Sequence, residues 1–304
     1  MQTIGLVGLG KMGYNIALNM NDNWIDVIGY DVNSDVVDKI NSEKLDHINA
    51  VDSLEKLVNK LPEKKVIWVM VPAGEITDET IHKLKALLSE GDIIIDGGNS
   101  NYKDSLRRYK DLKESKIGFL DCGTSGGQEG ARYGINAMIG GDADDFSYVE
   151  EIFQKISQEG GYLYTGEAGS GHYLKMVHNG IEYGMMAAIG EGFDLLENSG
   201  FEYDYEKVCQ LWNNGSVIRS WLIELAGNAF SKDSKLDGIE GVMYSSGEGK
   251  WMVEESVEKE LAIPVITMSL LMRYRSMEND TFTGKVVAAL RNEFGGHSMK
   301  EKNN

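Results

Sequence analysis

The chain has 304 residues, 42% of them hydrophobic, and carries a formal net charge of −18 at pH 7. This length fits one large or two ordinary domains, and the negative charge argues against nucleic acid or an anionic membrane as a partner. The apolar runs are shorter than a membrane span, and the first residues do not resemble a signal peptide. We therefore expect a cytoplasmic protein. Cys122 and Cys209 have no histidine or cysteine nearby, which argues against a metal site or a disulfide framework.

Short Ile- and Val-rich runs alternate with helical segments from residue 1 to about residue 165. The predicted strands are TIGLV (3–7), DVIGY (26–30), VIWVMV (66–71), IIID (93–96) and GFLDC (118–122). This order predicts a mostly parallel sheet with helices on both faces. Residues 166–304 show apolar residues at helical spacing and no convincing strand. We therefore expect two domains, an α/β domain over 1–165 and an all-helical domain over 166–304.

The first predicted strand runs into a glycine-rich turn, GLVGLGKMG (5–13), which is followed by a helical segment. Gly8, Gly10 and Gly13 form a G-x-G-x-x-G pattern, and in this context it indicates a Rossmann dinucleotide site that includes Lys11 and Met12. Asp31 ends the second strand, where an acid accepts hydrogen bonds from the adenosine ribose and repels a 2′-phosphate. The next three residues, Val32, Asn33 and Ser34, include no arginine that could bind that phosphate. The sequence therefore favours NAD over NADP.

Three loops follow later strands and reach the edge of the sheet where ligands bind in such folds. They are VPAG (71–74), DGGNS (96–100) and DCGTSGGQEGA (121–131). Paired glycines expose backbone N–H groups, which suits a carboxylate or a phosphate. We expect these loops to contact the cofactor and to form the floor of a substrate site, through Val71, Pro72, Ala73, Asn99, Ser125, Gly126 and Gly127.

The stretch KMVHNGIEYG (175–184) places four polar side chains in a segment with apolar flanks. At about 100° per residue, Lys175, His178, Asn179 and Glu182 share one face of a helix. A solvated stripe or an internal ion pair would explain many such patterns. Burial of unpaired charge is costly, however, so the apolar flanks favour a chemical use of these groups.

Six motifs in this order resemble 6-phosphogluconate dehydrogenase, the decarboxylating enzyme of the pentose phosphate pathway: GLGKMG, DGGNS, SGGQEGARYG, KMVHNGIEYG, GEGKW and RNEFGGH. The chain's length matches the short branch of that family. The resemblance implies a Rossmann domain and an all-helical domain used for substrate binding and oligomerisation. It also implies oxidation of 6-phosphogluconate to ribulose 5-phosphate and carbon dioxide, and a homodimer or homotetramer with shared active sites.

The resemblance also assigns roles to single residues. Lys175 matches the general base and Glu182 the general acid, and Arg273 matches an arginine that binds the phosphate. Arg291 and His297 match a pair that the neighbouring subunit contributes. The remaining expected substrate contacts are Asn99, Ser125, Gly126, Gly127, His178, Asn179 and Tyr183.

Two departures from the family pattern accompany these matches. Ser246 and Glu248 stand where long-branch enzymes hold the phosphate with lysine and threonine, so other groups must bind it here. Asp31 replaces the asparagine of NADP-specific members, in agreement with the independent preference for NAD.

Two other functions remain open at this point. A different β-hydroxyacid dehydrogenase, such as one for 3-hydroxyisobutyrate, would share the Rossmann start, the S-G-G loop and the lysine with an asparagine four residues later. It would lack the pair His178 and Glu182, because it does not decarboxylate. A non-catalytic NAD-binding regulator would need no acid–base pair.

Overall fold

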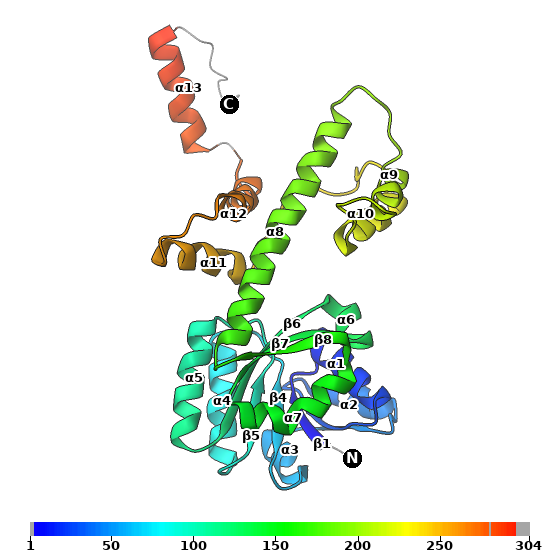
Figure 1. Cartoon of the computed structure of the whole chain (residues 1–304), viewed down its shortest axis with the longest axis vertical. Coiled ribbons are helices and arrows are strands. Elements are labelled where there is room, and N and C mark those ends of the chain that lie inside the picture. Colours follow the sequence, from blue (N-terminus) through cyan, green and yellow to red (C-terminus); the bar gives the residue numbers. More distant parts are fainter. Residues whose placement is uncertain (1–2, 280, 296–304) are drawn as a thin grey trace. The chain divides into compact units, whose positions relative to one another are not determined.

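The computed structural model describes residues 3–279 and 281–295. The chain divides into two compact units, Met1–Asn179 and Gly180–Asn304, and each is treated by itself (Figure 1). The division falls within the long helix α8 (Ser170–Glu197). Among the described residues, no helix combines the length and the apolar character needed to cross a membrane.

The first unit is built on one sheet, which has eight strands within the described residues, in the spatial order β3-β2-β1-β4-β5-β6-β7-β8. Neighbouring strands are parallel except β6 and β7, which are antiparallel. This confirms the predicted fold, a mainly parallel Rossmann sheet followed by helices. The strands are β1 (Thr3–Val7), β2 (Asp26–Tyr30), β3 (Ile48–Val51), β4 (Val66–Val69), β5 (Ile93–Asp96), β6 (Gly118–Ser125), β7 (Ile135–Gly141) and β8 (Ser157–Gly166).

Helices cover both faces of this sheet, because successive side chains of a strand point to opposite faces. In β5, Ile93 and Ile95 join one buried cluster and Ile94 joins the other. The first cluster contains residues of α1 (Lys11–Asp22), α2 (Ser34–Ser42), α6 (Gly127–Tyr133) and α7 (Ala143–Ile156). The second contains residues of α3 (Leu54–Lys60), α4 (Glu75–Leu87) and α5 (Tyr102–Glu114).

Three strands escape prediction from the sequence, namely β3, β7 and β8. The strand β8 has the composition SQEGGYLYTG and lies at the edge of the sheet, with much of its length exposed. Edge strands do not need the apolar runs that mark buried parallel strands. The predicted domain boundary after residue 165 remains a proposal. It lies near the end of β8 at Gly166 and the start of α8 at Ser170.

Within its described residues the second unit contains helices joined by loops and no strand, as predicted. Its elements after α8 are α9 (Tyr205–Asn213), α10 (Trp221–Lys232), α11 (Gly247–Glu258), α12 (Pro264–Ser276) and α13 (Phe282–Gly295). Side-chain caps begin two of them, because Asp204 accepts from Lys207 N and Ser220 accepts from Ile223 N. One buried cluster holds α8, α9 and α10 together through Phe193, Tyr205, Cys209, Ile223 and Phe230.

Candidate active site

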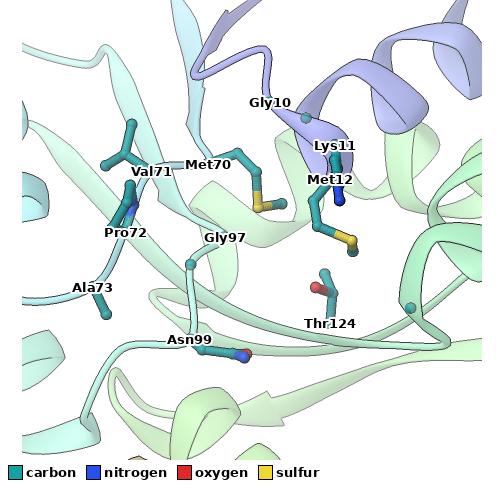
Figure 2. A pocket seen from close by; sticks show the side chains of 13 residues that line it. Gly10, Lys11, Met12, Met70, Val71, Pro72, Ala73, Gly97, Asn99 and Thr124 are labelled. Atoms are coloured by element: carbon teal, nitrogen blue, oxygen red, sulfur yellow. The ribbon is translucent and has the colours of Figure 1, made fainter. Parts of the chain in front are cut away.

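The first unit contains a pocket of about 500 Å³ beyond the carboxyl ends of β1, β4 and β5. The strand order reverses between β1 and β4, and such a switch point is where open α/β sheets bind ligands. Figure 2 shows the side chains of Met12, Met70, Asn99 and Thr124 around this space. The lining residues are Gly10, Lys11, Met12, Gly13, Met70, Val71, Pro72, Ala73, Gly97, Gly98, Asn99, Thr124 and Gly127.

The turn between β1 and α1 has the shape that a pyrophosphate requires. Gly8 has φ +92°, and a Cβ there would lie 2.3 Å from the carbonyl oxygen of Met70. A Cβ on Gly13 would lie 1.9 Å from Gly8 O, whereas one on Gly10 would meet no described atom within 4 Å. The first turn of α1 contains no acidic residue and, among the described residues, receives no side-chain cap. Its N–H groups therefore suit an anion next to Gly10.

Asp31 lies directly after β2 and is held by the backbone on both carboxylate oxygens. Oδ2 accepts a hydrogen bond from Leu9 N at 2.8 Å, and Oδ1 accepts one from Asn33 N at 2.9 Å. The carboxylate is thereby fixed beside the glycine turn that starts α1. This is the position from which an acid reaches the adenosine ribose in a Rossmann fold.

Most of the residues predicted to contact the cofactor line the pocket together. Gly8 and Asp31 lie outside its lining and shape the neighbouring turn. The pocket also contains residues that the sequence did not single out, Met70, Gly97, Gly98 and Thr124. The quoted stretches DGGNS and DCGTSGGQEGA already contained the two glycines and Thr124. Met70 was predicted to lie inside the strand 66–71, whereas β4 ends at Val69.

The start of α8 is fastened to the sheet by a buried carboxylate. Asp121 of β6 is fully buried and accepts hydrogen bonds from Gly169 N at 2.6 Å and from His172 N at 2.8 Å. These contacts satisfy N–H groups that a helix start leaves without partners. His172 is buried too, and its Nδ1 lies 2.7 Å from Ser105 Oγ of α5. Asp121, His172 and Ser105 were not predicted, because their contacts join distant parts of the chain.

Close approach of α8 to β6 then places Lys175. A Cβ on Gly123 would lie 2.3 Å from Lys175 Cβ, and a Cβ on Gly171 would lie 2.4 Å from Met138 O. Only glycines allow the helix and the strands to come this near. Lys175 is consequently 6% exposed.

The predicted polar stripe of the first unit assembles around His178. Lys175 Nζ lies 3.4 Å from His178 Nδ1, which lies 3.0 Å from Asn179 Oδ1. His178 Nε2 lies 3.2 Å from Ser125 Oγ. An amide oxygen only accepts, so a hydrogen bond to Asn179 Oδ1 requires a proton on Nδ1; in the neutral ring Nε2 is then free to accept from the Ser125 hydroxyl. The structure thus brings together four of the predicted residues from β6 and α8.

Ser125 connects this group with the pocket. Thr124, which precedes it, and Gly127, two residues after it, both line the pocket, and Gly126 adopts φ +102° as the N-cap of α6.

Cys122, on the same strand, is fully buried. Burial and the carboxylates of Asp121 and Asp96 raise the pKa of its thiol well above the ordinary value. The thiol therefore stays protonated and is unsuited to act as a nucleophile.

Within the second unit, two predicted substrate contacts lie together at another cavity, of about 460 Å³. The guanidinium of Arg273 lies 3.6 Å from the centre of the Tyr183 ring, and its Nη1 donates to Tyr244 O at 2.8 Å. The Tyr183 hydroxyl accepts from Ser246 N at 2.9 Å and lies 3.0 Å from Ser246 Oγ. Tyr183, Tyr244 and Arg273 all line this cavity.

The remaining predicted residues are more dispersed. Glu182 follows Asn179 on α8 and is partly buried, and Arg291 is exposed on α13. His297 lies outside the described residues. Glu248, in the first turn of α11, is 3% exposed, and its Oε2 has no hydrogen-bond partner among the described residues.

Comparison with known proteins agrees with this geometry. Residues 3–166 match the family model described as the NAD binding domain of 6-phosphogluconate dehydrogenase. Residues 171–302 match the model of the 6-phosphogluconate dehydrogenase C-terminal domain. The two matches together cover nearly the whole chain.

Individual relatives extend over the full length. YqeC of Bacillus subtilis, whose name gives 6-phosphogluconate dehydrogenase as a provisional activity, is 57% identical over 98% of this chain and 99% of its own. A Haloferax volcanii protein named as an NAD(+)-dependent, decarboxylating 6-phosphogluconate dehydrogenase is 38% identical over 98% of this chain and 99% of its own.

Solved structures show the same relationship. Plasmodium falciparum 6-phosphogluconate dehydrogenase, solved with NADP+ and with 6-phosphogluconate, matches with a TM-score of 0.84 and 31% identity over 99% of this chain and 67% of that one. Mycobacterium tuberculosis 3-hydroxyisobutyrate dehydrogenase matches with a TM-score of 0.72 over 96% of this chain and 99% of that one. At 19% identity, this match shows only that the two proteins share a fold.

Proposed function

This chain belongs to the 6-phosphogluconate dehydrogenase family, and we propose that it oxidatively decarboxylates 6-phosphogluconate to ribulose 5-phosphate and carbon dioxide with NAD as oxidant. The activity would place it in the pentose phosphate pathway and in gluconate utilisation, with the cytoplasm as its location. The observation that carries the proposal is the link between an acid–base group and a dinucleotide pocket. Ser125, flanked by pocket residues, is hydrogen-bonded to His178, and His178 lies beside Lys175.

The first step requires a base at the hydroxyl of C3. Bound NAD supplies a hydride acceptor. In this proposal the neutral amine of Lys175 takes the C3 hydroxyl proton as the hydride leaves the same carbon. Burial favours the neutral form of an amine, and Lys175 is 6% exposed. Asn179 and His178 hold hydroxyl groups of the substrate, so that the hydrogen on C3 points to the pocket.

The second step is loss of the carboxylate. The protonated Lys175 donates a hydrogen bond to the new C3 carbonyl, which draws in the electron pair released when the C1–C2 bond breaks and carbon dioxide leaves. Lys175 passes its proton to that oxygen, and an enediol results. Glu182, protonated, then gives a proton to the carbon that lost the carboxylate, while Lys175 takes back the proton of the C3 hydroxyl; the restored carbonyl completes ribulose 5-phosphate.

NAD rather than NADP is proposed because of Asp31. Its carboxylate is oriented by Leu9 N and Asn33 N, and a 2′-phosphate beside it would bring two anions together. The relative from Haloferax volcanii is named as NAD(+)-dependent, whereas the Plasmodium falciparum protein was solved with NADP+. The cofactor therefore differs among relatives, and Asp31 is the residue of this chain that we expect to decide it.

An oligomer with shared sites is part of the proposal. The helix α13 exposes apolar side chains that a second copy of the chain would cover, namely Phe282, Val286, Val287 and Leu290. Arg291 follows them on the same helix. An anionic substrate in a chain of net charge −18 needs added cations, and a partner's Arg291 and His297 would supply them at each site.

The 3-hydroxyisobutyrate alternative shares the fold and differs in its chemistry. An enzyme that does not decarboxylate has no use for an acid at the position of Glu182. A panel of sugar acids and hydroxy acids tests the two functions, with NADH formation and carbon dioxide release measured separately. Equimolar NADH and carbon dioxide from 6-phosphogluconate support the proposal. Turnover of 3-hydroxyisobutyrate without carbon dioxide release, and none of 6-phosphogluconate, would refute it.

A further inference from the structure

Two arms of chain line the pocket of the first unit, Val71–Ala73 after β4 and Gly97–Asn99 after β5. Neither arm belongs to a helix or a strand. Their positions relative to each other decide whether Asn99 and the backbone of the arms meet a bound dinucleotide correctly. One buried guanidinium, that of Arg108 on α5, contacts groups that hold both arms.

Arg108 reaches the second arm through Asp96 and Ser100, which flank it. Its Nη1 donates to Asp96 Oδ2 at 2.8 Å and to Ser100 Oγ at 2.9 Å. Asp96 Oδ2 also accepts from Ser100 Oγ at 2.9 Å, and Asp96 Oδ1 accepts from Gly98 N at 3.2 Å. The residues from 96 to 100 are thus closed into a small loop around one carboxylate.

The same guanidinium reaches the end of the first arm. Its Nη2 donates to Gly74 O at 3.3 Å, and its Nε donates to Asp78 Oδ1 of α4 at 2.7 Å. Thr77, in the first part of α4, donates to Pro72 O at 2.9 Å. The first arm is therefore anchored to the start of α4, and α4 is anchored to Arg108.

Burial makes this arrangement rigid. The side chains of Arg108 and Asp96 are 2% and 0% exposed, so removal of the guanidinium would leave the buried Asp96 carboxylate without this cation. Burial acts to raise the pKa of Asp78, but hydrogen bonds from Arg107 and Arg108 outweigh it, and this pKa lies below its ordinary value. Asp78 consequently remains a carboxylate at neutral pH. The planar, five-donor guanidinium is the side chain that can satisfy several acceptors at once.

We propose that Arg108 is a positioning residue that sets the distance between the two arms of the cofactor pocket and thereby the affinity for the dinucleotide. The inference rests on the proposed function, because it takes the pocket to be the dinucleotide site. Arg108 does not line the pocket. It acts through Asp96, Ser100 and Gly74.

Arg107 offers a matched control. It is the preceding residue on α5, it also pairs with Asp78, at 2.7 Å, and its side chain is 56% exposed. Its pairs with Asp78 and Asp104 do not touch either arm. Arg108→Lys, Arg108→Met and Arg107→Met are compared with the wild type for the dissociation constant of NADH by fluorescence, for KM and kcat, and for Tm.

We expect Arg108→Met to raise the dissociation constant of NADH and the KM for NAD at least tenfold, with a smaller change in the KM for 6-phosphogluconate. Arg108→Lys should raise both constants less than Arg108→Met does, but still above those of the wild type, because an ammonium cannot donate to all the acceptors in their geometry. Arg107→Met should stay within twofold of the wild type. Measurement well below each Tm separates this effect from a loss of stability.

Ser100→Ala keeps the experiment decisive if the Arg108 variants do not fold. It removes one acceptor of Arg108 and leaves both charges paired, and we expect it to raise the dissociation constant of NADH about threefold. If Ser100→Ala, and Arg108→Lys where it folds, bind NADH as tightly as Arg107→Met does, the role given to Arg108 is wrong and the proposed function stands. A wild type that binds no NADH would instead overturn the proposed function.

Discussion

A methyl group added at Gly123 should displace Lys175 from its position beside His178. The Cβ of Gly123→Ala would lie 2.3 Å from Lys175 Cβ and 2.8 Å from Lys175 Cγ. Carbon atoms rest at about 3.5–4.0 Å, so α8 or β6 must move by more than about 1 Å. The helix start is tied to β6 by Asp121, and this anchor resists the movement.

The expected cost can be divided between stability and rate. Overpacking of this kind destabilises by about 1–3 kcal/mol. For a unit of about 150–250 residues, such as Met1–Asn179, each kcal/mol lowers Tm by about 2–4 °C. A base displaced by about 1 Å loses roughly 10²-fold in rate, which corresponds to about 2.7 kcal/mol of barrier. We therefore expect kcat to fall by roughly two orders of magnitude in a protein that remains folded at 25 °C.

Gly192→Ala is the control for this substitution. Gly192 also lies in α8, and a Cβ there meets no described atom within 4 Å. Alanine in place of a helical glycine should stabilise by up to about 1 kcal/mol and leave kcat unchanged. The assays are NADH formation at saturating substrate and a urea unfolding curve. If Gly123→Ala kept kcat within twofold and Tm within 1–2 °C of the wild type, the close packing of α8 on β6 would not position the base.

Three further predictions concern the cofactor, the acid and the oligomer. Asp31→Asn should narrow the preference for NAD, measured as the ratio of kcat/KM for NAD and NADP; a wild type that uses NADP equally well contradicts the role given to Asp31. Lys175→Ala should abolish oxidation, whereas Glu182→Gln should form NADH but release less ribulose 5-phosphate; full sugar phosphate turnover in the second variant would exclude Glu182 as the acid. Lys175→Ala and Arg291→Ala chains, each nearly inactive, should regain part of the activity when co-assembled; proven mixing without recovery, or a fully active monomer, speaks against shared sites.

Local sequence patterns predicted the parts of the site that lie within one element. The glycines of the first turn and the face of α8 depend on spacings of a few residues, and both appear in the structure. Ser125 was predicted as well, because a loop after a parallel strand must reach the ligand edge of the sheet. The sequence did not reveal its hydrogen bond to His178.

Contacts between distant segments could not be predicted in this way. Asp121 and His172 are 51 residues apart, and Arg108 lies 34 residues from Gly74. Nothing in the composition of α5 distinguishes the buried Arg108 from the exposed Arg107 beside it. The orientation of the helix on the sheet decides which of the two is buried, and tertiary packing sets that orientation. The residues proposed to do the chemistry could thus be predicted from the sequence, whereas the residues that contact them from distant segments could not.

The second unit gives a physical reason for the proposal that binding of the substrate's phosphate depends on a second chain. Ser246 uses both its N–H and its hydroxyl on Tyr183, and Glu248 adds a buried carboxylate at the start of α11. Arg273 already donates a hydrogen bond from Nη1 to Tyr244 O. A phosphate beside them would therefore meet one partly engaged cation and one anion, which is a weak site. An arginine from a second chain would reverse that balance, so recovery of activity in the Lys175→Ala and Arg291→Ala hybrid would also test which cations bind the substrate.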